Sequence, residues 1–210
     1  MLDKVLRYAE PVIFTTQGLI GVLGVFLFIL LTRKLRQKQF YSSAAAQEFL
    51  AGVRERLQAE DIEGVTQWCD SPKYWAKAVP QLILIAMANR RLSIPKLRRL
   101  LFHKYEREIL AELTYQHSGM AVVAKTAPMV GLLGTVTGII GSFSKISVSQ
   151  KGDPGALAHD IGLALMATMW GLVIAIPMTL LGGYMMVRIS RLTDQVHSQI
   201  GEFLQDLEEM

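Results

Sequence analysis

Two stretches decide the fold of this chain: APMVGLLGTVTGIIGSF, residues 127–143, and IGLALMATMWGLVIAIPMTLL, residues 161–181. They belong to longer runs, residues 126–144 and residues 161–187, that contain no Asp, Glu, Lys, Arg or His. A helix needs about 20 apolar residues to cross the hydrocarbon core of a bilayer, and both runs suffice. A short polar segment, residues 147–158, separates them. We therefore predict a membrane helical hairpin.

The faces of the two predicted spans differ in character. In the second stretch the large apolar side chains repeat at helical spacing, at Ile161, Leu165, Met169, Leu172, Ile176 and Leu180. The small and hydroxyl side chains form a different stripe, at Ala164, Thr168, Gly171, Ala175, Thr179 and Gly182. The first stretch carries small residues at Gly131, Gly134, Thr135, Gly138, Gly141 and Ser142. Because small residues let helix backbones approach closely in a bilayer, we expect Gly131, Gly134, Gly138 and Gly171 to pack against neighbouring helices.

An earlier span, residues 12–32, is also uncharged and ends in a basic run, Arg33, Lys34, Arg36 and Lys38. The run is too long, and its flank too basic, for a cleaved signal peptide, so we interpret it as an uncleaved anchor. The positive-inside rule then places the N-terminus outside the cytoplasm and residue 33 onward in the cytoplasm. Three spans leave the C-terminus in the cytoplasm.

The chain between the first two spans is predicted to be a cytoplasmic helical region. We expect residues 40–69 to continue the first span as one helix, and Ser71 with Pro72 to open a second helix. Residues 79–88 are apolar but too short to span, and Pro80 interrupts them; a buried helix or a subunit contact is favoured over a re-entrant segment. Ser93 and Pro95 should open a third helix that feeds directly into the second span.

The C-terminal segment has an apolar stripe of its own, at Ile189, Leu192, Val196, Ile200, Phe203 and Leu207. It is predicted to extend the last span into the cytoplasm as an amphipathic helix. The expected organisation is thus a first span in residues 1–32, a cytoplasmic region in 33–118, a second span in 119–146, a periplasmic loop in 147–158, a third span in 159–188 and a cytoplasmic helix in 189–210.

Composition excludes several classes of protein. Hydrophobic residues make up 51% of the chain and charged residues 19%, which is too apolar for an ordinary soluble protein. The net charge of +4 reflects basic residues that we interpret as topology signals, so no nucleic-acid partner is expected. One cysteine and four scattered histidines offer no metal site, and no motif of an enzyme or a cofactor-binding fold is present. Transport is therefore favoured over catalysis.

Residues 120–187, and above all APMVGLLGTVTGII, resemble the MotA/TolQ/ExbB proton-channel family, in particular its three-helix ExbB and TolQ branch. The resemblance implies a ring-like homo-oligomer, a pentamer in this family, in the bacterial inner membrane. Its lumen would hold the helices of an ExbD/TolR-like single-span partner that carries a membrane Asp. Inward proton flow would then drive a TonB- or TolA-like protein that spans the periplasm.

The resemblance also assigns roles to individual residues. Thr135 and Thr168 match two threonines that line the channel lumen of the family, although a hydroxyl bonded back to its own helix explains such residues without any function. Pro177, within the recurrent AIP, should kink the third span. Leu163 stands where relatives carry an acidic residue. That departure leaves a second hypothesis open, a non-conducting oligomeric scaffold that organises partner proteins.

Overall fold

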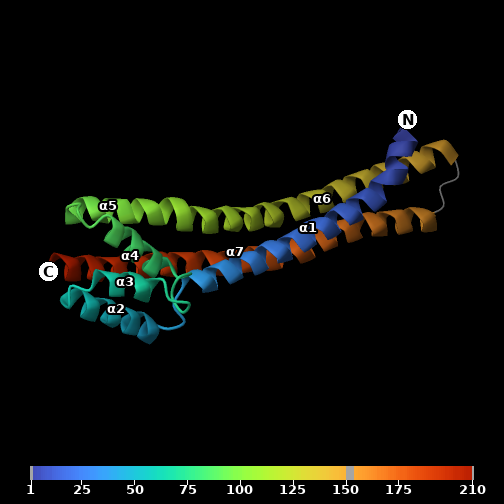
Figure 1. The fold of residues 1–210 in the computed structure, drawn as a ribbon. Helices are drawn as coiled ribbons and strands as arrows, with labels where there is room; N and C mark the ends of the chain where they lie inside the picture. The colour runs from blue at the N-terminus through green and yellow to red at the C-terminus, as the bar shows by residue number, and fades with distance from the viewer. Residues whose placement is uncertain (1, 150–153, 210) are drawn as a thin grey trace. The chain divides into compact units, whose positions relative to one another are not determined.

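The computed structural model describes the backbone of residues 2–149 and 154–209 and the side chains of residues 11–144 and 154–209. Every regular element in those residues is helical (Figure 1). The elements are α1 (Leu2–Lys38), α2 (Ser43–Gln58), α3 (Ile62–Cys69), α4 (Ala78–Ala88), α5 (Ile94–Lys104), the π-helix η1 (Tyr105–Leu110), α6 (Ala111–Ser149) and α7 (Pro154–Glu208). Three stretches are long and apolar enough to cross a membrane: Pro11–Lys38, Ile94–Ser144 and Pro154–Glu208. The expected all-helical protein with three candidate spans is confirmed.

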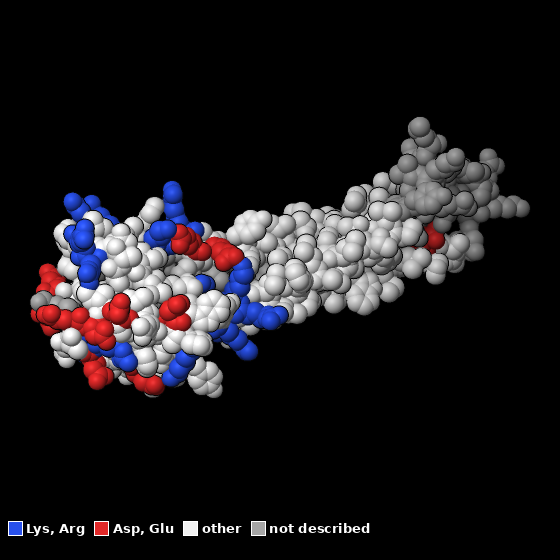
Figure 2. Space-filling model, in the orientation of Figure 1, with Lys and Arg blue, Asp and Glu red and all other residues white. Residues whose placement is uncertain are grey.

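The chain divides into two compact units. The apolar unit combines Met1–Ile29 with His117–Tyr184, and the charged unit combines Leu30–Gln116 with Met185–Met210. Figure 2 shows Lys, Arg, Asp and Glu gathered on the charged unit, whereas the visible face of the apolar unit is almost bare of them. This distribution is expected if the apolar unit lies in a bilayer, because charged side chains are costly in hydrocarbon.

In the apolar unit, segments of α1, α6 and α7 lie side by side (Figure 1). The large apolar stripe of α7 faces outward, since five of its members are exposed: Leu165, Met169, Leu172, Ile176 and Leu180. In the stripe of small residues Ala164, Gly171, Ala175 and Gly182 are buried, Thr168 is partly exposed and Thr179 is exposed. The two stripes thus differ in exposure, and most of the small stripe is packed inside the unit.

The charged unit has an ordinary hydrophobic core. Phe49 on α2, Val65 on α3 and Ile83 on α4 are fully buried there. Tyr74 packs edge-on against Phe49, with ring centroids 4.8 Å apart, and also contacts Trp68. The interpretation of residues 79–88 as a buried helix is confirmed by α4, of which Leu82, Ile83 and Ala86 are buried.

The expectation of one helix over residues 40–69 is wrong, because capping side chains interrupt it twice. The hydroxyl of Ser42 accepts a hydrogen bond from the amide of Ala45 and starts α2. At the other end Glu60 adopts φ 54°, and the amide of Asp61 donates to the carbonyl of Arg56 at 2.9 Å. This left-handed helix stop is typical of glycine and here accommodates a glutamate. The Asp61 carboxylate then caps α3 through the amide of Gly64.

The prediction that Ser71 and Pro72 open a helix is also wrong. The Ser71 hydroxyl donates to the carbonyl of Trp68 at 2.8 Å, so it closes the end of α3 instead. The next helix, α4, begins only at Ala78. Pro80 does not interrupt this helix, because it lies in the first turn, where backbone amides have no partner within the helix.

The helix predicted to start near Ser93 and Pro95 is confirmed and continues through α5, η1 and α6. The π-helical turn η1, which begins at the buried Tyr105, is not predicted by the sequence analysis. The Tyr105 hydroxyl lies 3.0 Å from the Thr193 hydroxyl of α7. The amphipathic C-terminal helix is likewise confirmed as the end of α7, with Ile200 and Phe203 buried. Leu204 is buried as well, whereas Leu207 is partly exposed.

The segment between the last two spans is shorter than the expected loop of residues 147–158. Helix α6 continues to Ser149, and α7 begins at Pro154. Residues 150–153 of the expected loop lie outside the described residues.

We expect Cys69 to resist alkylation in the folded protein. Its thiol is fully buried in the charged unit, and burial raises its pKa to about 12. Because the thiolate is the nucleophile, the neutral thiol should react slowly near pH 7. Mass spectrometry after iodoacetamide treatment should show labelling only in unfolded protein. Rapid labelling of the native protein would contradict this placement of α3.

Candidate functional site

The hydroxyls of Thr135 on α6 and Thr168 on α7 are hydrogen-bonded to each other. Thr135 Oγ1 also lies 3.3 Å from two carbonyl oxygens, those of Gly131 on its own helix and Ala164 on α7. Both residues are partly exposed. The two threonines singled out from the sequence therefore form one site, 33 residues apart in the chain.

Other threonines of the same helices behave differently. Thr137 Oγ1 donates to the carbonyls of Leu133 and Gly134, and Thr179 Oγ1 donates to the carbonyl of Ala175. Each of these bonds stays within one helix, as is common for threonine in membrane helices. Among the threonines of α6 and α7 inside the apolar unit, the bond across two helices is thus specific to Thr135 and Thr168 in the part of the chain that the structure describes.

Small residues allow α6 and α7 to approach closely on both sides of the threonine pair. A Cβ atom added at Gly134 would lie 2.6 Å from Ala167 Cβ, and one at Gly138 would lie 2.6 Å from Ala164 Cβ. At Gly171 the nearest atom would be the carbonyl oxygen of Ala127, again at 2.6 Å. Real Cβ atoms do not approach other atoms so closely. The glycines predicted to pack helices lie, in this structure, at the contact between α6 and α7 of one chain.

Gly131 has a further neighbour. A Cβ there would lie 2.8 Å from the carbonyl oxygen of Ala167, 2.9 Å from Thr168 Cα and 3.2 Å from Nε2 of Gln17. Gln17 belongs to α1, is only 2% exposed, and donates from Nε2 to the Ala167 carbonyl at 2.7 Å. Sequence reasoning missed Gln17, because residues 12–32 were judged by their lack of charge. A lone amide inside an apolar span was the available signal.

An apolar groove of about 700 Å³ between α1 and α7 adjoins this amide. Gln17 and the indole of Trp170 supply its polar atoms, and the other lining residues are apolar or glycine. Trp170 is 46% exposed, so it remains a candidate for packing against a neighbouring helix.

A second polar side chain that sequence reasoning missed lies between α6 and α7. Nε2 of His117 is 3.1 Å from the carbonyl oxygen of Gly182. Because a carbonyl can only accept, this nitrogen carries the proton in the bond. His117 thus ties the two helices together at a position well separated in sequence from Thr135 and Thr168.

The uncharged runs that contain the threonine pair, residues 126–144 and 161–187, supply hydroxyls but no carboxylate. Asp160 and His159 lie in the first turns of α7, before the uncharged run. Leu163, near the start of the uncharged run of α7, is partly exposed. Among the residues that the structure describes, no cluster of three or more His, Cys, Asp or Glu is suited to bind a metal ion. Pro177 lies inside α7 and removes one backbone hydrogen bond there.

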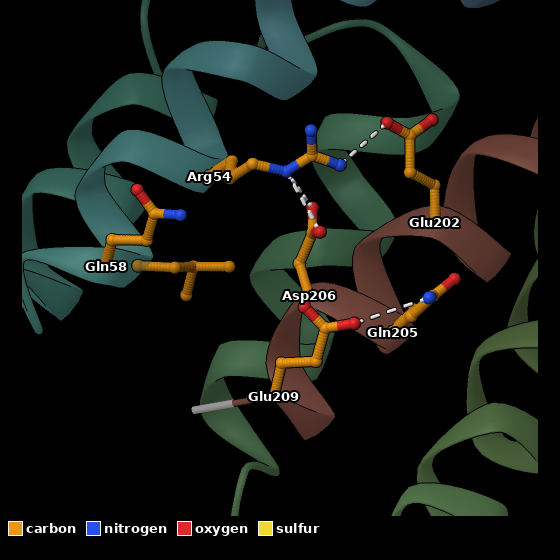
Figure 3. Close-up of a pocket in the computed structure, with 7 residues that line it drawn as sticks. Arg54, Gln58, Glu202, Gln205, Asp206 and Glu209 are labelled. Atoms are coloured by element: carbon orange, nitrogen blue, oxygen red, sulfur yellow. Dashed lines mark hydrogen bonds and ion pairs between the residues drawn. The ribbon is translucent and has the colours of Figure 1, made fainter.

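The charged unit contains a separate polar pocket of about 440 Å³ (Figure 3). Arg54 points from α2 toward α7, where its guanidinium pairs with Asp206 at 2.9 Å and with Glu202 at 3.0 Å. Hydrogen bonding to Asp206 raises the pKa of Arg54 above its usual value. These charges satisfy one another near the surface, so the pocket is a structural ion-pair cluster between helices.

Three helices that are long and apolar enough to cross a membrane define a multi-pass membrane protein. The model of the MotA/TolQ/ExbB proton channel family matches residues 77–198, which include α4, α5, η1, α6 and most of α7. The chain belongs to this family, whose members are transport proteins and not enzymes.

Individual relatives agree with this assignment. The chain is 25% identical over 202 residues to a putative biopolymer transport protein ExbB homolog of Methanothermobacter thermautotrophicus, covering 93% of this chain and 70% of that protein. It is 37% identical over 102 residues to the biopolymer transport protein ExbB of Xanthomonas campestris, covering 47% of this chain and 39% of the relative. It is 31% identical over 134 residues to the biopolymer transport protein ExbB of Salmonella typhimurium, covering 59% of this chain and 55% of the relative. The matches to these two bacterial proteins thus span about half of each relative or less.

Proposed function

We propose that this chain is the ExbB/TolQ-like subunit of a proton-driven motor in the cytoplasmic (inner) membrane. Several copies, five by resemblance to the family, would surround the single membrane helices of an ExbD/TolR-like partner. Proton flow would put force on a TonB- or TolA-like protein across the periplasm. The observation that carries the proposal is the hydrogen-bonded pair Thr135 and Thr168, which supplies a polar site between the uncharged runs of α6 and α7.

The pair can serve a carboxyl group in both of its protonation states. When Thr168 donates to Thr135, the Thr135 proton can go to the Ala164 carbonyl at 3.3 Å, and the Thr168 oxygen is left able to accept. When Thr135 donates to Thr168, the Thr168 proton has no described acceptor and can be donated elsewhere. The first arrangement suits a protonated carboxylic acid and the second suits a carboxylate. A Thr hydroxyl does not titrate near neutrality, so the pair hydrates and orients the group that does.

The titratable group has to come from a partner, because the runs that contain the threonine pair, residues 126–144 and 161–187, have no Asp, Glu, Lys, Arg or His. Placing an unpaired charge inside hydrocarbon has a high free-energy cost, and a polar site that faces the charge lowers this free-energy cost. A membrane Asp on a single-span partner meets this requirement. We therefore expect no conduction by this subunit alone.

Leu163 favours one alternative, the non-conducting scaffold. In that case the α6 and α7 contact would serve assembly only, and the missing acid would reflect a loss of ion transport. Proton flux measured in liposomes with the ExbD-like partner present distinguishes the two functions. Flux above that of empty liposomes supports the channel, whereas assembly with the partner but without flux supports the scaffold.

Membrane orientation is part of the proposal and can be tested with reporters. Fusions after Lys38 and after Met210 should be active as cytoplasmic reporters, and an insertion at Gly152 should be active as a periplasmic one. The reason is the basic run that follows the first span, together with Arg188 and Arg191 after the third. Phosphatase and fluorescent-protein fusions give opposite readouts for the two sides. Reversed labelling would overturn the orientation.

A further inference from the structure

Gln17 is a buried polar residue of the apolar unit that the proposed function does not yet use. Its side chain is 2% exposed, and it bonds to a backbone carbonyl 150 positions away in sequence. The atom facing the Ala167 carbonyl has to be the amide nitrogen, since a carbonyl cannot donate. The other amide atom, Oε1, is buried and accepts no hydrogen bond from any described residue. Neighbouring Thr15, by contrast, is exposed and bonds only to carbonyls of its own helix.

The surrounding helices are arranged to admit this amide. Gly131 of α6 lacks a side chain at the point where the Gln17 amide meets the backbone of α7. Any Cβ at residue 131 would collide with the Ala167 carbonyl and with Thr168 Cα, and would crowd Gln17 Nε2. The amide of α1, the glycine of α6 and the carbonyl of α7 therefore form one three-helix contact.

This contact holds the turn of α7 that carries Thr168. The Ala164 carbonyl lies 3.3 Å from the Thr135 hydroxyl of α6, and the Ala167 carbonyl accepts from Gln17 of α1 at 2.7 Å. Two carbonyls of one turn are thus bonded from two different helices. The rotation of α7 about its own axis is restrained at the residue whose hydroxyl has to face Thr135.

We propose that Gln17 is a positioning residue of the ion path: its amide N–H fixes the Ala167 carbonyl and thereby directs the Thr168 hydroxyl toward Thr135. This inference rests on the proposed function. It assigns to the first span a role in conduction beyond anchoring, through a donated hydrogen bond.

The test uses the complex of the full chain with its ExbD-like partner, reconstituted in liposomes, with proton flux read from a pH-sensitive dye. Gln17→Met keeps the length of the side chain but removes the donor. Flux per assembled complex should fall about three- to tenfold, the effect of losing one hydrogen bond. Thr15→Val is the matched control, because it removes a polar group from the same helix that bonds only within that helix; its flux should equal that of the wild type.

The pH dependence of flux in Gln17→Glu distinguishes a hydrogen-bonding role of residue 17 from a packing role. A carboxylic acid can donate to the Ala167 carbonyl only while it is protonated. Flux of this variant relative to wild type should be close to one at about pH 5 and should fall as pH rises toward about 9. Gln17→Met should show a constant ratio over the same range.

The outcomes separate the two claims. If the wild-type complex shows no proton flux, both the proposed function and this inference are overturned. Wild-type flux that is matched by Gln17→Met overturns the inference alone. A pH-independent ratio for Gln17→Glu shows that residue 17 acts through packing and not through a donated hydrogen bond, and this also overturns it.

Discussion

Replacing Thr168 with valine is expected to reduce proton-driven function about 10- to 100-fold without loss of assembly. Valine keeps the shape of threonine but removes the hydroxyl that bonds to Thr135. Hydrogen bonds to charged groups contribute about 1.5–3 kcal/mol, and each 1.36 kcal/mol in a barrier is about tenfold in rate. The measurement is proton flux per assembled complex in liposomes containing the partner.

Thr179→Val is the matched control for this variant. The Thr179 hydroxyl donates to the Ala175 carbonyl of its own helix at 2.8 Å and forms no hydrogen bond to α6 among the residues that the structure describes. Its flux should stay near the wild-type value. Full function in a Thr135→Val/Thr168→Val double variant would show that the threonine pair is not part of the ion path.

The second large effect is expected at Gly171. In Gly171→Ala the new Cβ would lie 2.6 Å from the Ala127 carbonyl oxygen and 3.2 Å from Pro128 Cα. Both neighbours are backbone, so a rotamer change cannot relieve the collision and the two helices have to separate. Overpacking of this kind costs about 1–3 kcal/mol. Because Gly171 lies one turn from Thr168, the threonine bond should be lost together with stability.

Gly183→Ala serves as the control for Gly171→Ala. The added Cβ meets nothing within 4 Å, and alanine favours a helix more than glycine does. Thermal unfolding in detergent should therefore show a lower midpoint for Gly171→Ala and an unchanged or higher midpoint for Gly183→Ala. Equal midpoints for the two variants would contradict the close approach of α6 and α7.

The three spans could be predicted from sequence because each contains about 20 consecutive uncharged residues, enough to cross a bilayer. This criterion depends only on the sequence of the span itself and not on its contacts with other helices. The same holds for the outward stripe from Leu165 to Leu180, which repeats at helical spacing. The helices of the charged unit were harder to predict, since local bonds set their ends. Ser71 closes one helix where its sequence suggested the start of another, and Glu60 takes a left-handed conformation that is typical of glycine.

The candidate site was predictable in part. Resemblance to the family pointed to Thr135 and Thr168, and the small stripes explained why two helices can meet there. The contributions of Gln17 and His117 depend on contacts between helices distant in sequence, which no pattern within one span reveals. Gln17 could at least have been suspected, because a buried amide in a membrane needs a partner.

Proton flux across liposomes that contain this subunit, with and without its single-span partner, tests the central claim most directly. The uncharged runs of α6 and α7, residues 126–144 and 161–187, provide a hydroxyl pair and no carboxylate, so a partner has to bring the group that titrates. We expect no flux above empty liposomes from the subunit alone and inward flux once the partner is present. Flux from the subunit alone would contradict the account.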